Sequence, residues 1–174
     1  MLRLLQIDEM GIKIYNDIKS FNVKLLMGTR YLGTPDEVLA LDTYVKLVRA
    51  TESVSNRIHR HLAEHDLTVS QFGVLEALFH IGTLYQRDLA EKLLKSGGNM
   101  TLVIDNLEKR ELVKREREVE DRRCIKVSLT PKGDRLIREI FPDHVAAVVQ
   151  EMSILTISEQ EELGRLCRRL GKKE

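Results

Sequence analysis

The sequence predicts a mostly α-helical protein with one small two-stranded β-hairpin, and three observations support this fold class. The chain has three prolines and no tryptophan, and long stretches are rich in Leu, Glu, Lys and Arg, a balance that favours helices. From Pro35 onward, apolar residues recur at helical spacing, and between Leu112 and Leu129 the period changes to alternation. With 43% hydrophobic and 32% charged residues, the 174-residue chain suits a folded domain rather than a disordered one.

Start signals for helices recur along the chain before the hairpin. Pro35 is followed by two acidic residues, which favour the first turn of a helix. Thr68-Val69-Ser70-Gln71 fits a capping box, in which the Thr and Gln side chains bind free backbone N–H groups, and Ser96 is a typical N-cap. The expected helices run from Pro35 to about His65, from the capping box to Gly82, over residues 86–93, and from Gly97 to about Arg110.

Two strands and two further helices complete the expected fold. Because a two-stranded ribbon is marginally stable by itself, the hairpin must pack on the helices. Thr130-Pro131 starts a helix in which Pro142 is expected to produce a kink or a break. A last short helix runs from Ser158 to about Leu170. The expected strands are residues 112–116 and 124–129, joined by a charged turn.

Residues 1–34 differ from the rest, because they mix Ile, Leu and Lys without a settled period. Three interpretations of this arm remain open: an extra helix, a mis-assigned start codon with Met27 as the genuine start, or an expression remnant. Mass spectrometry of the natively expressed protein would separate them.

Cysteine content and hydropathy exclude several classes of protein, whereas the net charge excludes none. The 28 basic and 27 acidic residues give a net charge of +1, so charge alone neither predicts nor excludes a nucleic-acid partner. Cys124 and Cys167 are too few and too far apart for a disulfide framework or a zinc site. No apolar run reaches the roughly 18 residues needed to span a bilayer, and no secretory segment is apparent, so a cytoplasmic protein without a membrane partner is expected.

No motif predicts an enzyme, a cofactor or a metal site. Ser96-Gly97-Gly98-Asn99 lacks the Lys-Ser/Thr pair of a phosphate-binding loop, and no nucleophile has a base at recognisable spacing. His61 and His65 have the spacing of metal ligands on one helix face, but no Cys-His cluster accompanies them. We therefore expect a binding protein rather than a catalyst.

Two short helices followed by a charged hairpin describe a winged helix-turn-helix. An α-helix fits the major groove of B-DNA, and its N-terminal half presents side chains to the base edges. A hairpin that carries arginine can reach a neighbouring minor groove, where narrow A·T-rich segments attract guanidinium groups. The order of elements therefore predicts double-stranded DNA as the partner.

Three stretches in this order resemble the MarR family of transcriptional regulators. They are residues 86–93 (QRDLAEKL), residues 100–110 (MTLVIDNLEKR), and Asp121-Arg122-Arg123 followed by Leu129-Thr130-Pro131-Lys132-Gly133. The resemblance covers about residues 37–170 and implies a homodimer. It also implies a ligand-responsive repressor on a pseudo-palindromic operator, with half-site centres about 10 base pairs apart. Residues 35–174 would form the family domain, with 67–130 as the DNA-binding lobe and 35–65 plus 131–170 as the dimerisation helices.

The resemblance also implies roles for individual residues. Gln86 would meet the DNA backbone, and Asp121 would hold an arginine of the wing by an ion pair. Arg122 or Arg123 would enter the minor groove, although acidic neighbours also allow a self-neutralised surface turn. The residues expected on the recognition helix are Ser96, Asn99 and Thr101 toward the major groove, and Asn106 and Lys109 near the phosphates.

Leu102 and Cys124 leave alternatives open. Many family members carry arginine at the position of Leu102, and a leucine can contact a thymine methyl group but cannot donate to guanine, which shifts recognition toward DNA shape. Alternatively, Leu102 packs inward. Cys124 lies among basic residues, which can lower a thiol pKa, so a redox-responsive regulator is an alternative to an ordinary strand residue.

A small aromatic or phenolic effector and a purely protein-binding module complete the alternatives. Relatives bind such effectors between the dimer helices and the lobe, and each candidate lining residue could equally be ordinary core. Salt-dependent binding to a palindromic duplex would separate a DNA reader from a module that contacts only proteins. The candidate lining residues are Tyr44, His59, Phe72, His80 and Met152.

Overall fold

The computed structural model describes residues 30–118 and 124–172, and the chain divides into two units, Met1–Ser53 and Val54–Glu174. In the described part of the first unit, helix α2 (Pro35–Ile58) begins as expected, with acidic residues in its first turn. The backbone N–H of Thr34 donates to Glu37 at 2.8 Å and so secures the start of the helix. The predictions for residues 1–29, including Met27, lie outside the described residues.

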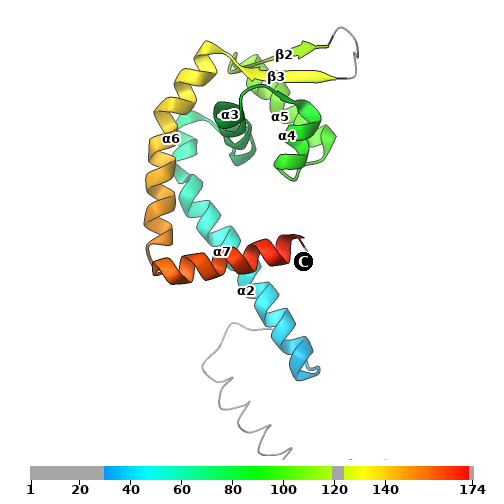
Figure 1. Cartoon of the computed structure of the whole chain (residues 1–174), viewed down its shortest axis with the longest axis vertical. Helices are drawn as coiled ribbons and strands as arrows, with labels where there is room; N and C mark the ends of the chain where they lie inside the picture. Colours follow the sequence, from blue (N-terminus) through cyan, green and yellow to red (C-terminus); the bar gives the residue numbers. More distant parts are fainter. Residues whose placement is uncertain (1–29, 119–123, 173–174) are drawn as a thin grey trace, which may run out of the picture. The chain divides into compact units, whose positions relative to one another are not determined.

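The second unit contains the remaining helices and all described strands (Figure 1). In chain order they are the end of α2, the 3₁₀ helix η1 (His59–His65), α3 (Val69–Ile81), β1 (Leu84–Tyr85), α4 (Gln86–Lys92), α5 (Gly97–Lys109), β2 (Val113–Arg117), β3 (Ile125–Leu129), α6 (Pro131–Met152) and α7 (Ile157–Lys172). This order confirms the predicted winged helix-turn-helix. None of the described helices is long and apolar enough to cross a membrane.

The predicted helix caps are confirmed. The hydroxyl of Thr68 accepts the N–H of Gln71, and the Gln71 side chain accepts the N–H of Thr68 in return. Ser96 caps α5, and Thr130 caps α6 directly before Pro131. These local signals fix where α3, α5 and α6 begin.

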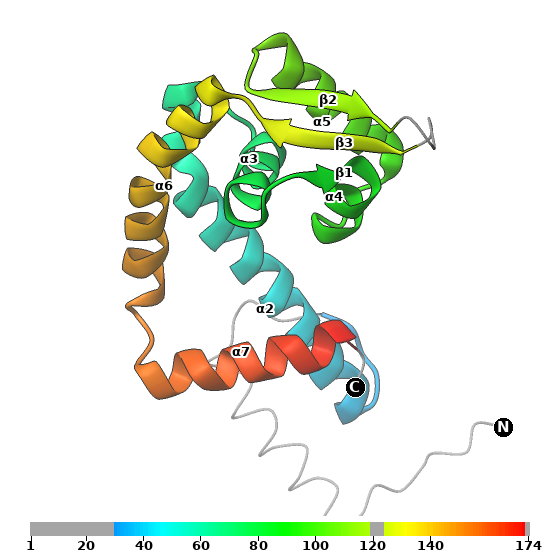
Figure 2. The ribbon, with the colours of Figure 1, turned by 45° about the horizontal axis from the view of Figure 1, so that its top comes forward.

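The sheet has three strands where the sequence predicted two. Its antiparallel order is β1-β3-β2, so β3 lies in the middle and pairs Val127 with both Leu84 and Arg115 (Figure 2). The two residues of β1 are too short to produce an alternating pattern, and the sequence therefore gave no sign of this strand. Its presence ties the hairpin to the start of α4.

Two further expectations differ from the structure. The first long helix does not remain α-helical to His65, because α2 passes into the 3₁₀ helix η1, a common change at helix ends. Pro142 was expected to kink or break its helix, and the break is wrong, since α6 continues through Pro142. Pro142 lies on an exposed face, where the carbonyl that loses its partner can bind water instead.

The core of the second unit lies between α3, α4, α5, the sheet and the first half of α6. Its largest fully buried side chain is Phe72 of α3. α6 enters this core at Gly133, which is buried directly against the backbone of Leu112. Other fully buried members come from each surrounding element: Leu75, Leu89, Ile104, Val127, Ile137 and Ile140. The lobe therefore has a complete core within one chain.

Candidate nucleic-acid interface

Helix α5 has a buried face and an exposed face. Its inward stripe, as predicted, consists of Met100, Val103, Ile104 and Leu107. On the other side, Asn99 and Lys109 are exposed, and Leu102 exposes 60% of its surface. The alternative in which Leu102 packs inward is therefore wrong. Its methyl groups are available to a partner, and its contact with DNA stays a prediction.

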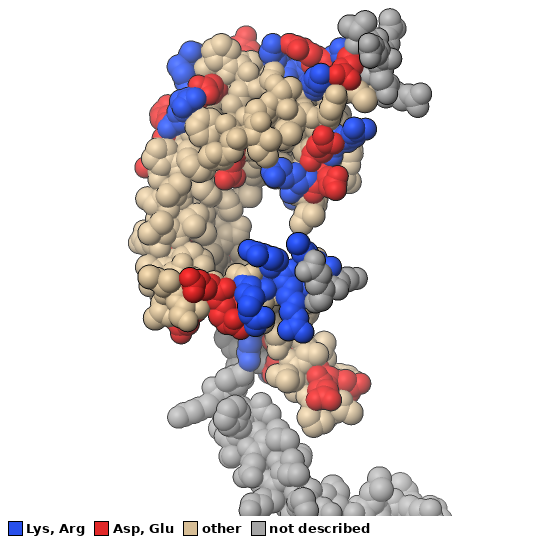
Figure 3. Space-filling view, viewed as in Figure 1, with Lys and Arg blue, Asp and Glu red and all other residues tan. Residues whose placement is uncertain are grey.

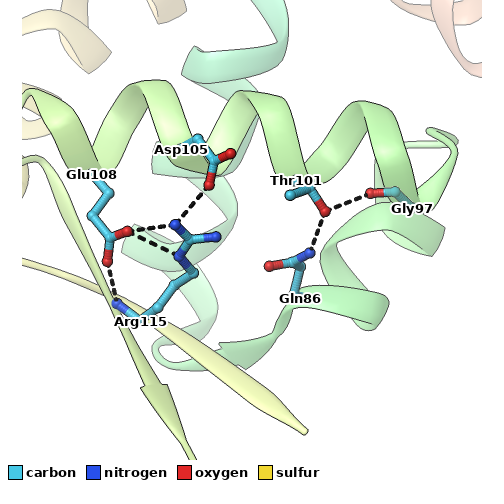
Figure 4. A network of polar contacts seen from close by, with 6 residues as sticks. All are labelled: Gln86, Gly97, Thr101, Asp105, Glu108 and Arg115. Carbon is cyan, nitrogen blue, oxygen red and sulfur yellow. Dashed lines mark hydrogen bonds and ion pairs between the residues drawn. The ribbon is translucent and has the colours of Figure 1, made fainter. Parts of the chain in front are cut away.

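A hydrogen-bonded pair joins α4 to α5 (Figure 4). Gln86 Nε2 donates to Thr101 Oγ1 at 2.8 Å, and that hydroxyl donates to the carbonyl of Gly97 at 3.0 Å. Both side chains are half-buried. Gln86 Oε1 is buried without a hydrogen-bond partner among the described residues. Gln86 and Thr101 thus fix the angle between the two helices, and their contacts with DNA stay predictions.

Arg115 of β2 fastens the other end of α5 (Figure 4). Its guanidinium contacts Asp105 Oδ1 at 2.6 Å and Glu108 Oε2 at 2.6 Å and 3.0 Å. Its backbone N–H donates to Glu108 Oε1 at 3.2 Å. The hydrogen bonds from Arg115 hold the pKa of Glu108 below its ordinary value. In the sequence, Arg115 was one of several charged residues in a surface turn, whereas in the structure it supports α5.

Replacing Arg115 with alanine is expected to lower the free energy of unfolding by about 1 to 2 kcal/mol, because two carboxylates lose a half-buried guanidinium partner. Because the pKa of Glu108 is lowered, this contribution is complete above pH 4.5 and is lost as the pH falls through the lowered value. Urea unfolding at pH 7 and at pH 3 measures both effects. Lys114→Ala on the same strand removes only an exposed ion pair and serves as the control. Equal stability of the two variants would contradict the assignment.

The remaining residues predicted at the DNA interface differ in their exposure, and three of them lie outside the described residues. Ser96 is exposed, and its hydroxyl accepts the N–H of Asn99 as a helix cap. Asn106 is half-buried. Asp121, Arg122 and Arg123 lie outside the described residues, and their roles in the wing stay predictions.

Cys124 lies at the base of the wing, directly before β3. It is half-buried, and its carbonyl accepts the N–H of Glu118 at 3.1 Å. This hydrogen bond closes the described part of the hairpin beyond the β2–β3 ladder. A redox role for the thiol stays a prediction.

Three imidazoles gather where η1, α3 and α6 meet. The His144 ring lies 5.5 Å from the rings of His59 and His61 and 4.5 Å from the Phe72 ring, centroid to centroid. Burial, together with the two neighbouring histidines, lowers the pKa of His144 to about 4, so this imidazole is neutral at pH 7. His61 Nε2 and His144 Nδ1 are buried without hydrogen-bond partners among the described residues.

Four of the five candidate effector-lining residues lie in the second unit, and their role stays a prediction. His59 and Phe72 belong to this histidine cluster, whereas His80 packs edge-on against Phe141 at 4.8 Å. Met152 is half-buried near the end of α6. Tyr44 belongs to the first unit, where it exposes 64% of its surface. The sequence missed His144, because a single histidine after Pro142 carries no pattern. Among the described residues, no group of three His, Cys, Asp or Glu is arranged to hold a metal ion.

Comparison with known proteins gives the same fold and assigns the family. The family model described as "MarR family" matches residues 67–125. Over 132 residues, 76% of this chain and 91% of the relative, the sequence is 34% identical to the HTH-type transcriptional regulator MhqR of Bacillus subtilis (strain 168). The structure of AbsC, a MarR family transcriptional regulator from Streptomyces coelicolor, is similar with a TM-score of 0.70 at 26% identity, covering 83% of this chain and 97% of AbsC.

A second solved structure carries information on a ligand. It is BpsR of Bordetella bronchiseptica, with a TM-score of 0.66 at 26% identity over 72% of this chain and 89% of that one. Its title concerns the regulation of BpsR DNA binding by 6-hydroxynicotinic acid. The winged helix-turn-helix, the family model and a relative aligned over 91% of its length agree, and the chain belongs to the MarR family of transcriptional regulators.

Proposed function

We propose that the protein binds double-stranded DNA as a homodimer and represses transcription from a pseudo-palindromic operator in response to a small molecule. The observation that carries this proposal is the division of α5 into a supported face and an open face. Gln86 and Arg115 secure the helix from both sides, while Asn99, Leu102 and Lys109 remain exposed. A rigid helix with an unoccupied polar and methyl-bearing face is suited to read a major groove.

The dimer is supported by apolar surface outside the lobe. In the first unit, α2 exposes Leu39, Tyr44 and Val48. In the second unit, α7 buries none of its residues, and Leu163, Leu166 and Leu170 form one exposed apolar face. Monomeric proteins seldom leave such stripes uncovered. A second copy of the chain is the partner that we propose for both surfaces.

The order of charges along α7 also favours a second copy. Acidic residues occupy its first half and basic residues its second half, and Figure 3 shows the basic side chains gathered over the C-terminal half. An antiparallel copy would place acids opposite bases along the whole contact. The charged residues of α7 are Glu159, Glu161, Glu162, Arg165, Arg168, Arg169 and Lys172.

In the dimer, two recognition helices would occupy successive major grooves, with half-site centres about 10 base pairs apart. The wings would enter the flanking minor grooves, where Leu102 in place of a hydrogen-bond donor gives DNA shape more weight. Occupation of a promoter by this complex would exclude polymerase, and repression follows. If deletion of the gene for this protein lowers the activity of a reporter behind that promoter, the protein is an activator instead of a repressor.

The proposed effector is a small aromatic or phenolic compound that binds near the histidine cluster. The unpaired nitrogens of His61 and His144 can exchange hydrogen bonds with a hydroxyl or carboxylate group. A hydroxylated aromatic acid is also the regulator named for BpsR. To release DNA, the compound must bind more tightly to the lobe spacing that does not match the operator. Thermal stabilisation by a panel of such acids, lost in His144→Ala, tests this site.

The combined substitution Arg122→Ala and Arg123→Ala is expected to weaken operator binding by about 5- to 100-fold, because the wing loses its minor-groove contact. Fluorescence anisotropy with duplexes from the region upstream of the gene, repeated at several salt concentrations, measures this loss. Arg60→Ala, an exposed arginine on η1, is the control. The proposal would be contradicted if scrambled and upstream duplexes bound equally well, or if the affinity did not fall with salt. The alternative of a module that contacts only proteins would then remain.

A further inference from the structure

The residue at the start of α4 is unusual for its position. Tyr85 occupies the N-cap and makes no side-chain capping hydrogen bond. Ser, Thr, Asp and Asn are preferred there because their short oxygens reach the free N–H groups of the first turn, which a phenol cannot do. α4 therefore gives up a stabilising cap, and the Tyr85 side chain is engaged elsewhere.

The Tyr85 hydroxyl reaches the base of the wing. It donates to Glu118 Oε1 at 3.0 Å, and the same carboxylate oxygen forms an ion pair with the ammonium of Lys126. Lys126 Nζ lies 5.5 Å from the centre of the Tyr85 ring, and the Arg87 guanidinium carbon lies 5.2 Å from it. One carboxylate thus joins β1 to the strands of the hairpin, and two cations contact the aromatic ring.

The contact between Tyr85, Glu118 and Lys126 lies where it can set the direction of the wing. Glu118 directly follows β2, and its N–H donates to Cys124 at the last described point of the hairpin. Tyr85 pairs with Lys126 in the sheet and immediately precedes Gln86, which holds α5. The contacts therefore connect α5, through the start of α4, to the β2–β3 hairpin at the base of the wing.

We propose that Tyr85, Glu118 and Lys126 form a wing clamp, a set of positioning residues that fixes the direction of the wing relative to the recognition helix. The inference rests on the proposed DNA-binding function. The clamp holds the hairpin so that its tip meets the minor groove while α5 occupies the adjacent major groove. Without it, the outer part of the hairpin, where β2 and β3 extend past the two residues of β1 and are marginally stable as a pair, samples other directions. Binding must then order the wing, and affinity falls.

For Glu118→Gln, phosphate repulsion alone and the clamp predict opposite changes in the affinity for DNA, and this makes the clamp testable. Glu118→Gln removes a negative charge close to the DNA-binding surface, so reduced repulsion of phosphates would tighten binding. The clamp predicts weaker binding, because the ion pair with Lys126 is lost. Glu116→Gln removes the same charge from the neighbouring strand β2 and is the matched control. Glu116 lies opposite Lys126 in the β2–β3 ladder, but its carboxylate pairs with Lys114, so the Glu118–Lys126 ion pair and the Tyr85 hydrogen bond remain in this variant.

We expect Glu118→Gln and Tyr85→Phe each to weaken operator binding by about 5- to 10-fold, while Glu116→Gln binds equally well or more tightly. Urea unfolding should show little change, since Tyr85→Phe keeps the half-buried ring. In a background that carries Arg122→Ala and Arg123→Ala, Glu118→Gln should lose its effect on affinity, because no wing contact remains to be positioned. Unchanged or tighter binding of Glu118→Gln, or the same loss in both backgrounds, would overturn the clamp.

Hydrogen exchange on the DNA-free protein provides a readout that does not depend on DNA binding. Both clamp variants should speed exchange of the Glu118 and Lys126 amides at the base of the wing, with the amides of α3 unchanged. Exchange equal to wild type would overturn the clamp even if affinity falls. If wild type fails to prefer the upstream duplex, the proposed function fails, whereas faster exchange in the variants still supports the clamp as a structural element.

Discussion

Replacing Gly133 with alanine is expected to lower the free energy of unfolding by about 3 kcal/mol, the upper end of what overpacking costs in a core. A Cβ atom at this position would lie 1.9 Å from the carbonyl oxygen of Leu112. Backbone cannot move aside as the end of a flexible side chain can. The same carbonyl accepts the N–H of Thr130 at 3.1 Å, so any shift also breaks the hydrogen bond that leads into α6.

Urea unfolding followed by circular dichroism measures this effect. Gly98→Ala is the matched control, because a Cβ atom there meets nothing within 4 Å and alanine is the better helix former. The control should be as stable as wild type or slightly more stable. If Gly133→Ala unfolds at the same urea concentration as Gly98→Ala, the close approach of α6 to Leu112 is not a feature of the folded protein.

The substitution Leu166→Glu is expected to convert the proposed dimer to monomers and to weaken operator binding by at least about 100-fold. A charge at the centre of the exposed apolar face of α7 would have to be buried without a partner in the interface. A monomer binds one half-site and loses the avidity of two linked recognition helices. Sedimentation or light scattering gives the mass, and anisotropy gives the affinity.

Ser158→Glu places the same residue on the charged side of α7 and serves as the control for this experiment. Its mass and affinity should match wild type, and both variants should retain the helical spectrum. A dimeric Leu166→Glu variant would show that α7 is not in the interface, and the exposed face of α2 would then be the next to test.

Features that depend on neighbouring residues could be predicted from the sequence. Each of these features depends on residues that lie within a few turns of one helix. They are the capping box of Thr68, the caps at Ser96 and Thr130, and the inward stripe of α5. The order of these elements was enough to predict the winged helix-turn-helix. It was not enough to place side chains in the interface.

The supports of the interface could not be predicted, because they join residues that are distant in the sequence. Gln86 and Thr101 come from two helices, and Tyr85 meets Glu118 across 33 positions. In the sequence, Arg115 resembles the other charged residues around it, and only the folded structure brings it to Asp105 and Glu108. Pro142 shows the converse: its local rule predicted a kink or a break, yet α6 continues through it, because the carbonyl that loses its partner lies on an exposed face and can bind water.

The two faces of α5 separate what the protein recognises from what keeps it folded. Asn99, Leu102 and Lys109 lie on the exposed face, whereas Asp105 and Glu108 are held by Arg115. Substitutions on the open face should therefore change operator preference at little cost in stability. Duplicated genes of this kind can diverge toward new target sequences by changing a few exposed side chains, and a library restricted to these positions offers a practical route to regulators with altered specificity.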